Sequence, residues 1–160
     1  MKKLTLISFA FLLLFCFSSC LKTDDNCCTA PFQPFLGYNV GGLRLYNDVT
    51  TAKVGTDSIS IIGTRSDSKL IVHIKYSGKG TYTLAGNQAM FFPKTGAVTG
   101  TYNVSTHSVS KLEVTEVDSV KKLAAGKFSL TLKKVAASSP GAQPDSIVLT
   151  NGEFGIVLPR

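Results

Sequence analysis

Short runs of alternating apolar and polar residues limit the fold of this chain more than any other feature. Between residues 126 and 134, Phe128, Leu130 and Leu132 alternate with polar or charged residues. Because successive side chains of a strand point to opposite faces, this pattern predicts one buried and one solvent-facing side. No stretch after Gly37 sustains the period of an amphipathic helix. The pattern therefore predicts an all-β domain over residues 37–160.

The same alternation recurs at residues 59–61, 70–76 and 112–114, with Gly, Asn, Asp and Ser between the runs. Roughly eight to ten short strands in largely meander order are typical of a single antiparallel β-sandwich or barrel. Sequence alone leaves the choice between sandwich and barrel open.

Three segments carry turn signals. The run 78–80 (Gly-Lys-Gly) predicts a hairpin between the strands 70–76 and 81–84. Asn151-Gly152 predicts a second hairpin, with a bulge in one long strand as the alternative. The segment 136–144, rich in Ala, Ser and Pro, predicts a flexible hairpin tip.

The N-terminus has the order of an export signal. Lys2 and Lys3 precede an apolar stretch over residues 6–17, and two small serines precede Cys20. This arrangement predicts a lipoprotein signal over residues 1–19, with Cys20 carrying the lipid, although Phe17 stands where Leu is usual. A retained transmembrane helix and soluble secretion are the alternatives, but the strongly apolar part is short for a span.

Residues 20–36 predict a lipidated, flexible tether. Leu21 is not the Asp that retains lipoproteins in the inner membrane, and Lys22, Asp24 and Asp25 are similar to short acidic export tags. The tether therefore predicts an outer-membrane protein held by acyl chains such as palmitate, with surface exposure as a further hypothesis.

Removal of Lys2 and Lys3 with the signal lowers the net charge from +7 to +5. This modest basic excess outside the cytoplasm favours anionic lipid, glycan or wall polymer as a partner. No block of five like charges exists, which argues against a nucleic-acid partner.

Metal and cofactor sites have little support in the sequence. Cys20 is assigned to the lipid, and only Cys27 and Cys28 remain after it, adjacent to one another in the tether. The chain has two histidines, His73 and His107. Since zinc sites depend on close ligand spacing, we expect neither a metal nor a cofactor.

Candidate catalytic groups are scattered. His73 and His107 are candidates for a general base, but an ordinary surface position is the simpler interpretation of each. The carboxylates available for glycoside hydrolysis are Glu113, Glu116, Asp118 and Asp145. Glu113 and Glu116 have opposite strand parity, so they are expected on different faces unless a bulge intervenes.

Two surface interpretations concern binding. Phe91-Phe92-Pro93, together with the tyrosines, is a candidate platform for stacking on sugar rings. Lys127 and Lys133, with Lys111 on a neighbouring strand, are candidates for a basic face. A core position for the aromatic residues and a solvated sheet face for the lysines are the simpler alternatives.

Several short patterns occur in a recognisable order: Gly-Thr-Tyr-Thr-Leu at 80–84, Gly-Lys-Phe-Ser-Leu at 126–130 and Thr-Asn-Gly-Glu-Phe at 150–154. Together they resemble a Bacteroidetes-type family of small lipoproteins of unknown function, over roughly Gly55 to the C-terminus. The resemblance implies an all-β lipoprotein and brings no catalytic residue.

The sequence therefore favours a lipid-anchored cell-envelope protein that is a non-enzymatic binding or structural module, with a glycan or small molecule as ligand. A cell-envelope hydrolase acting on glycan or peptide is the alternative. No catalytic residue is assigned, and Cys20 is the one assigned site, for lipidation.

Overall fold

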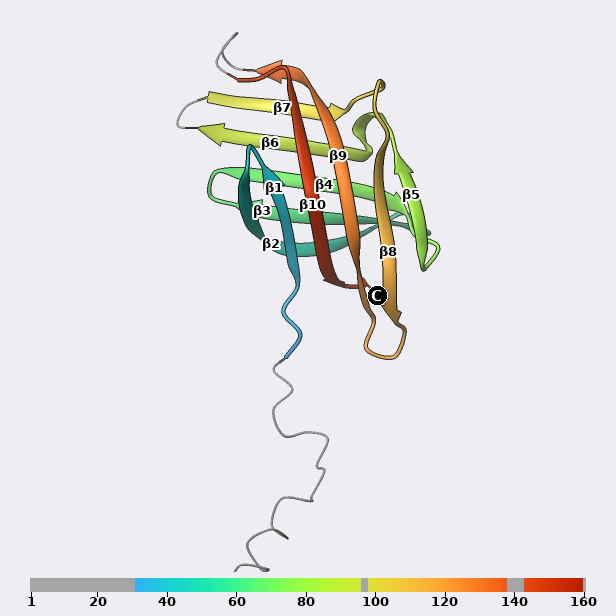
Figure 1. Cartoon of the computed structure of the whole chain (residues 1–160). Coiled ribbons are helices and arrows are strands. Elements are labelled where there is room, and N and C mark those ends of the chain that lie inside the picture. The colour runs from blue at the N-terminus through green and yellow to red at the C-terminus, as the bar shows by residue number, and fades with distance from the viewer. Residues whose placement is uncertain (1–30, 96–97, 138–142, 160) are drawn as a thin grey trace, which may run out of the picture. The chain divides into compact units, whose positions relative to one another are not determined.

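The computed structural model describes residues 31–95, 98–137 and 143–159 and shows an all-β fold (Figure 1). The strands, in chain order, are β1 (Phe35–Val40), β2 (Leu43–Val54), β3 (Ser58–Arg65), β4 (Ser68–Lys75), β5 (Gly80–Leu84), β6 (Ala89–Thr95), β7 (Val98–Val104), β8 (Ser110–Asp118), β9 (Leu123–Ala137) and β10 (Ser146–Val157). One short 3₁₀ helix, η1 (Gly86–Gln88), precedes β6. The all-β prediction is confirmed.

Eight antiparallel strands close into a barrel in the order β10-β1-β2-β3-β4-β6-β7-β9, and β9 pairs with β10 to complete the ring. β8 and β5 extend the sheet beyond β9. In Figure 1, β3, β4, β6 and β7 run across the direction of β8, β9 and β10. Closure leaves few open strand edges, which otherwise attract non-native pairing.

The longest strand, β9, pairs with three other strands. One edge of β9 pairs with β10, and its other edge pairs first with β8 and then with β7. Its alternation decides which side chains enter the core: Phe128 is 4% exposed, and Leu130 and Leu132 are fully buried. The predicted alternation of this strand, and the burial of its apolar face, are confirmed.

The core fills the barrel with aliphatic side chains around a group of four aromatic rings. Tyr38 meets Phe91 edge-on at 6.3 Å between ring centroids and lies 6.2 Å from Phe128. Phe91 in turn lies 6.4 Å from Tyr102. Such pairs of rings stabilise beyond the area that they bury.

The predicted hairpin at Gly78-Lys79-Gly80 is wrong. β5 does not return along β4; it pairs with β8, at the far end of the sheet. Both edges of β4 are already occupied, by β3 and β6. Gly78 and Gly80 have positive φ angles, so these glycines allow the chain to leave β4 and cross to β8.

Asn151-Gly152 is the bulge of one long strand and not a hairpin. β10 continues from Ser146 to Val157, and its register with β9 shifts between Leu149 and Gly152. β9 and β10, on either side of the predicted hairpin tip at residues 136–144, pair as antiparallel neighbours, and residues 138–142 of this tip lie outside the described residues.

The N-terminal assignments lie mostly outside the described residues. The predicted lipidation site Cys20, the pair Cys27 and Cys28 and the predicted signal all precede residue 31. β1 begins at Phe35, inside the segment assigned to the tether and just before the predicted domain start. Every strand lies in the compact unit Gln33–Arg160. In the described part of the chain, no helix is long and apolar enough to cross a bilayer.

Candidate functional site

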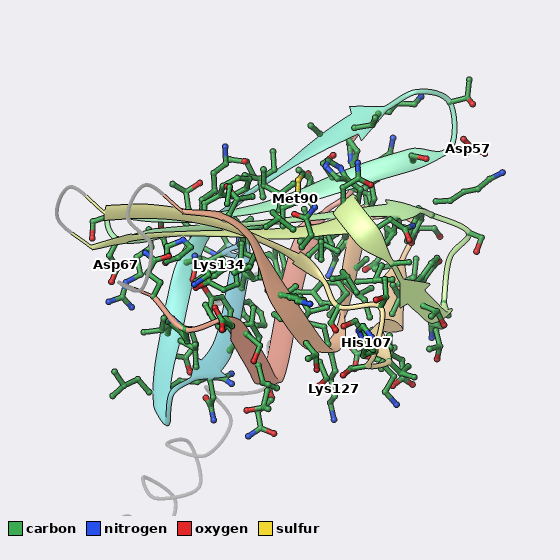
Figure 2. All side chains as sticks on the ribbon, turned by 90° about the horizontal axis from the view of Figure 1, so that it is seen from above. Asp57, Asp67, Met90, His107, Lys127 and Lys134 are labelled. Carbon is green, nitrogen blue, oxygen red and sulfur yellow. The ribbon has the colours of Figure 1, made fainter. Side chains whose placement is uncertain are left out.

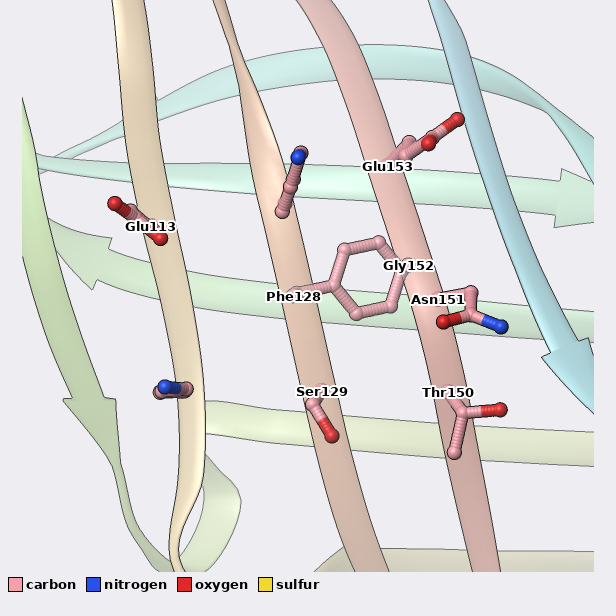
Figure 3. Close-up of a pocket in the computed structure, with 9 residues that line it drawn as sticks. Glu113, Phe128, Ser129, Thr150, Asn151, Gly152 and Glu153 are labelled. Carbon is pink, nitrogen blue, oxygen red and sulfur yellow. The ribbon is translucent and has the colours of Figure 1, made fainter.

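A hollow of about 560 Å³ lies on the outer face of β8, β9 and β10, at the bulge of β10 (Figure 3). At this bulge Asn151 has a φ of 49°, and Thr150 and Asn151 are both exposed. An extra residue in one strand interrupts its pairing and bends the strand, so the bulge opens the sheet surface here. The lining residues are Lys111, Glu113, Lys127, Phe128, Ser129, Thr150, Asn151, Gly152 and Glu153.

The floor of the hollow is the ring of Phe128, which lies against Gly152 (Figure 3). A Cβ at Gly152 would come within 2.4 Å of the Phe128 ring, so only glycine leaves room for the ring at this position. The bulge at Gly152 and the position of the Phe128 ring therefore depend on each other.

Charged side chains form a row across the hollow. Glu113, Lys127 and Glu153 are cross-strand partners on β8, β9 and β10. Neighbouring strands lie about 4.8 Å apart, so β8 and β10, which carry Glu113 and Glu153, lie roughly 10 Å apart. β9, which carries Lys127, lies between them. Figure 3 shows Glu113 and Glu153 on either side of β9.

Arg44 and Tyr46 of β2 lie next to Glu153 at one rim of the hollow, and neither is among its lining residues. The guanidinium of Arg44 donates to the Glu153 carboxylate over 2.9 Å and to the backbone carbonyl of Asn151. Its Cζ lies 5.2 Å from the centre of the Tyr46 ring, a cation–π distance. Gly37 lies between Glu153 and Tyr46 in the register, and a Cβ there would come within 2.9 Å of the Tyr46 ring. Tyr46 is 62% exposed and is held in place by these contacts.

Two of the three predicted basic residues meet at this site. Lys111 and Lys127 both line the hollow, on adjacent strands. Lys133 lies further along β9, opposite Ser146, and is not among the lining residues. Because Glu113 and Glu153 lie beside Lys127, the face carries both signs of charge and is not a purely basic face.

The sequence left the faces of Glu113 and Glu116 dependent on a bulge, and the structure has that bulge. The register with β9 shifts between Val114 and Glu116, so Glu113 faces Lys127 and Glu116 faces Ala125. Since Ala125 and Lys127 share the outer face of β9, both glutamates lie on that face. The structure therefore follows the alternative that the sequence left open, in which a bulge brings the two glutamates onto one face.

The two predicted aspartates have other roles. Asp118 accepts hydrogen bonds from the backbone amides of Val120 and Lys121, so it closes the β8–β9 turn. Asp145 lies 2.8 Å from the ammonium of Lys134. The hydrogen bond from Lys134, together with its charge, lowers the pKa of the Asp145 carboxyl, which opposes a role as general acid.

His73 has a partner that sequence reasoning missed. Its Nδ1 lies 2.6 Å from the hydroxyl of Ser60, its direct cross-strand neighbour on β3. A serine hydrolase needs such a contact, but Ser60 is only 3% exposed. Among the described residues, no carboxylate is hydrogen-bonded to His73. We interpret the pair as a structural contact within the sheet.

His107 lies in the loop between β7 and β8, where it is exposed and 3.2 Å from the hydroxyl of Thr106. Figure 2 shows it well apart from Asp57 and Asp67. Neither Asp57 nor Asp67 is therefore placed to be the acid partner that a catalytic histidine needs.

The candidate Phe91-Phe92-Pro93 platform does not form, because the strand separates its two rings, and Phe91 has the core position that was the simpler alternative. Phe91 is 3% exposed and belongs to the core, and Phe92 points to the opposite face of β6. Of the five tyrosines, Tyr38 and Tyr102 are buried in the core. Tyr46, at the rim of the hollow, is 62% exposed, so its ring is available for stacking against a ligand.

A second polar group lies inside the barrel. Tyr38, Asn47 and Ser68 are all more than nine-tenths buried, and the hydroxyl of Tyr38 and the amide of Asn47 have no hydrogen-bond partner of good geometry in the described chain. Burial raises the pKa of the Tyr38 hydroxyl, and the nearby side chains of Ser68 and Asn47 act in the opposite direction. These residues face the core and do not line the outer hollow.

Fold and site together define a small antiparallel β-barrel with a polar hollow on its outer face. In the described ranges, no group of three or more His, Cys, Asp and Glu residues is placed to hold a metal ion. No family model, curated protein or solved structure matches the chain.

Proposed function

We propose that this chain is a lipid-anchored cell-envelope protein whose β-barrel is a non-enzymatic binding module for a glycan. The observation that carries the binding proposal is the hollow at the β10 bulge, with its mixed row of charged, hydroxyl and amide side chains. The export signal and the cysteine at position 20 support the anchor. The resemblance to a family of small lipoproteins also supports the anchor, and it suggests no activity.

The mixture of groups favours a neutral, hydroxyl-rich ligand. A sugar hydroxyl both donates and accepts hydrogen bonds, so it can pair with the acceptor Glu153, the donor Lys127 and the amide of Asn151. A strongly anionic polymer would meet Glu113 and Glu153 as like charges. Tyr46 at the rim offers an exposed ring face for stacking against a sugar.

Binding of neutral oligosaccharides and peptidoglycan fragments to the chain from residue 20 tests this proposal. We expect Glu153→Gln and Tyr46→Ala each to weaken binding about tenfold, because hydrogen bonds to charged groups and aromatic contacts contribute about 1–3 kcal/mol. Titration calorimetry measures the change. Lys133→Gln is the matched control, since it removes a charge from the same face of β9 outside the hollow. Equal glycan binding by the parent, Glu153→Gln and Tyr46→Ala, or no binding of any glycan, would contradict the proposal.

A glycan hydrolase is the second candidate, and the β8 bulge favours it. Because the bulge brings Glu113 and Glu116 onto one face two strand positions apart, about 7 Å separates their backbone positions. Inverting glycosidases use carboxyl groups about 6.5–9.5 Å apart. Both residues are exposed, however, whereas a glycosidase shields a protonated acid from water. Release of reducing ends by the parent, lost in Glu113→Gln, would favour hydrolysis over binding.

The anchor gives a separate prediction. If Cys20 accepts the lipid, Cys20→Ser should leave an uncleaved precursor without acyl chains. Metabolic labelling with a radioactive fatty acid, followed by electrophoresis, measures both properties. Cys27→Ser is the control, because it removes a nearby cysteine that the signal does not use. Label that survives on the Cys20→Ser chain would exclude this assignment.

A further inference from the structure

One end of the barrel combines three features on strands that are distant in sequence. β1 begins there at Phe35, which pairs with Gly155 near the end of β10. Gly155 in turn pairs with Ala125 of β9, close to the β8–β9 turn. Figure 1 shows the start of β1, the β8–β9 turn and the end of β10 at the same, lower end of the barrel. The chain that precedes the barrel therefore joins it at the end that carries this turn.

The β8–β9 turn projects beyond the start of β1 at this end. Asp118 and Leu123 are its last paired residues, and they lie two positions beyond the row that contains Phe35. At about 3.3 Å per residue, the turn begins roughly 7 Å past the start of β1. Asp118 holds it in shape through hydrogen bonds to two backbone amides, of 3.0 and 2.8 Å. The backbone carbonyl of Lys122 also accepts a hydrogen bond from Leu158, which ties the turn to the C-terminal segment.

The tip of this turn carries an apolar residue followed by two cations. Val120 is 91% exposed, the highest fraction among the exposed large apolar residues. Lys121 and Lys122 follow it and are exposed, and neither pairs with a carboxylate of the described chain. Phe35 and Val157, at the same end, are 38% and 43% exposed. An apolar tip flanked by lysines suits the interface of an anionic bilayer, where the lysines attract headgroups and the valine enters the acyl boundary.

We propose that the β8–β9 turn contacts the anionic surface of the membrane that carries the anchor, so that the barrel sits on that surface with this end down. The proposal rests on the lipid anchor of the proposed function. From Cys20 to the start of β1 the chain can span at most about 50 Å, which keeps the turn within reach of the bilayer. Because β8, β9 and β10 rise away from the turn, the glycan hollow then faces sideways from the membrane and stays open.

Two exposed valines at opposite ends of β8 provide a matched pair of probe positions. Val120 follows β8, and Val109, which is 77% exposed, precedes it. The chain from residue 20, with its own three cysteines replaced by serine, carries a polarity-sensitive fluorophore on Val120→Cys or on Val109→Cys. A polyhistidine tag in place of the lipid holds the chain on vesicles that contain a nickel-chelating lipid. This chain keeps the compact unit Gln33–Arg160 entire.

We expect the probe at position 120, and not that at position 109, to brighten severalfold on vesicles of phosphatidylcholine with phosphatidylglycerol. Phosphatidylcholine alone should give little change, and added salt should reverse the response. Lys121→Gln/Lys122→Gln should lower the ratio of contacting to free barrels about tenfold or more, since each lysine near an anionic surface contributes a factor of about five. Lys69→Gln/Lys133→Gln removes the same charge elsewhere and should have little effect.

Equal responses at positions 109 and 120, or equal effects of the two lysine pairs, would overturn the proposal. No response on the anionic vesicles would overturn it as well. The artificial tag separates this result from the anchor: absent fatty-acid labelling of Cys20 would contradict the lipoprotein assignment, whereas the probe reports the turn alone.

Discussion

Phe128→Ala is expected to lower the free energy of unfolding by about 3–5 kcal/mol, the range for removing a buried phenylalanine. The Phe128 ring is 4% exposed, packs against Tyr38 and lies under Gly152. Its removal leaves a space that the backbone of the β10 bulge cannot fill. Urea unfolding followed by far-ultraviolet circular dichroism measures the loss.

Ser129→Ala is the matched control, since it changes the next residue of β9 on the opposite face. We expect an effect within about 0.5 kcal/mol, as for most surface substitutions. Comparable losses from both variants would mean that the register of β9 is not the one described. Phe128→Ala should also weaken glycan binding, because it removes the floor of the hollow.

Gly126→Ala is expected to cost about 3 kcal/mol, at the upper end for added volume in a packed region. A Cβ at this position would lie 1.9 Å from the backbone carbonyl oxygen of Glu113 and 2.8 Å from the ring of Phe154. The carbonyl belongs to the paired strand β8 and cannot move without breaking the ladder. The same unfolding measurement applies.

Gly37→Ala is the control for Gly126→Ala. Its Cβ would also meet close neighbours, but they are the Tyr46 ring and the Arg44 guanidinium, at 2.9 and 3.0 Å, which are the ends of side chains and not backbone. We expect a loss below about 1 kcal/mol, accompanied by weaker glycan binding as Tyr46 is displaced. A larger loss at Gly37 than at Gly126 would contradict the described packing of β8 on β9.

Alternation predicted the strands well because it depends only on which face of a strand is buried. The core positions of β9 and β4 follow from it directly: Phe128, Leu130 and Leu132 in one, Leu70, Val72 and Ile74 in the other. Pairing partners did not follow. Gly-Lys-Gly at 78–80 satisfied the local requirements of a hairpin, yet β5 pairs with β8, because β3 and β6 occupy both edges of β4.

The candidate site depended on register, which a single sequence does not contain. Lys111 and Lys127 were recognised as potential neighbours, whereas the place of Glu153 beside Lys127, and of Arg44 beside Glu153, required the pairing of β1, β2 and β10. Asn151-Gly152 was the local signal that could have marked the hollow, since a bulge was one of its two interpretations. Tyr46 gave no signal of its own.

The sequence by itself determined the all-β class and predicted the export signal and the lipid-acceptor cysteine, because each depends on local composition or on a period of two residues. Only the tertiary structure decided that the sheet closes into a barrel, that Glu113 and Glu116 share a face and that the β8–β9 turn shares an end with the start of β1. A shift of one residue at a bulge moves every later side chain to the other face of the strand. That shift is set by packing against neighbouring strands, such as the Phe128 ring against Gly152, and not by the residues of the strand alone.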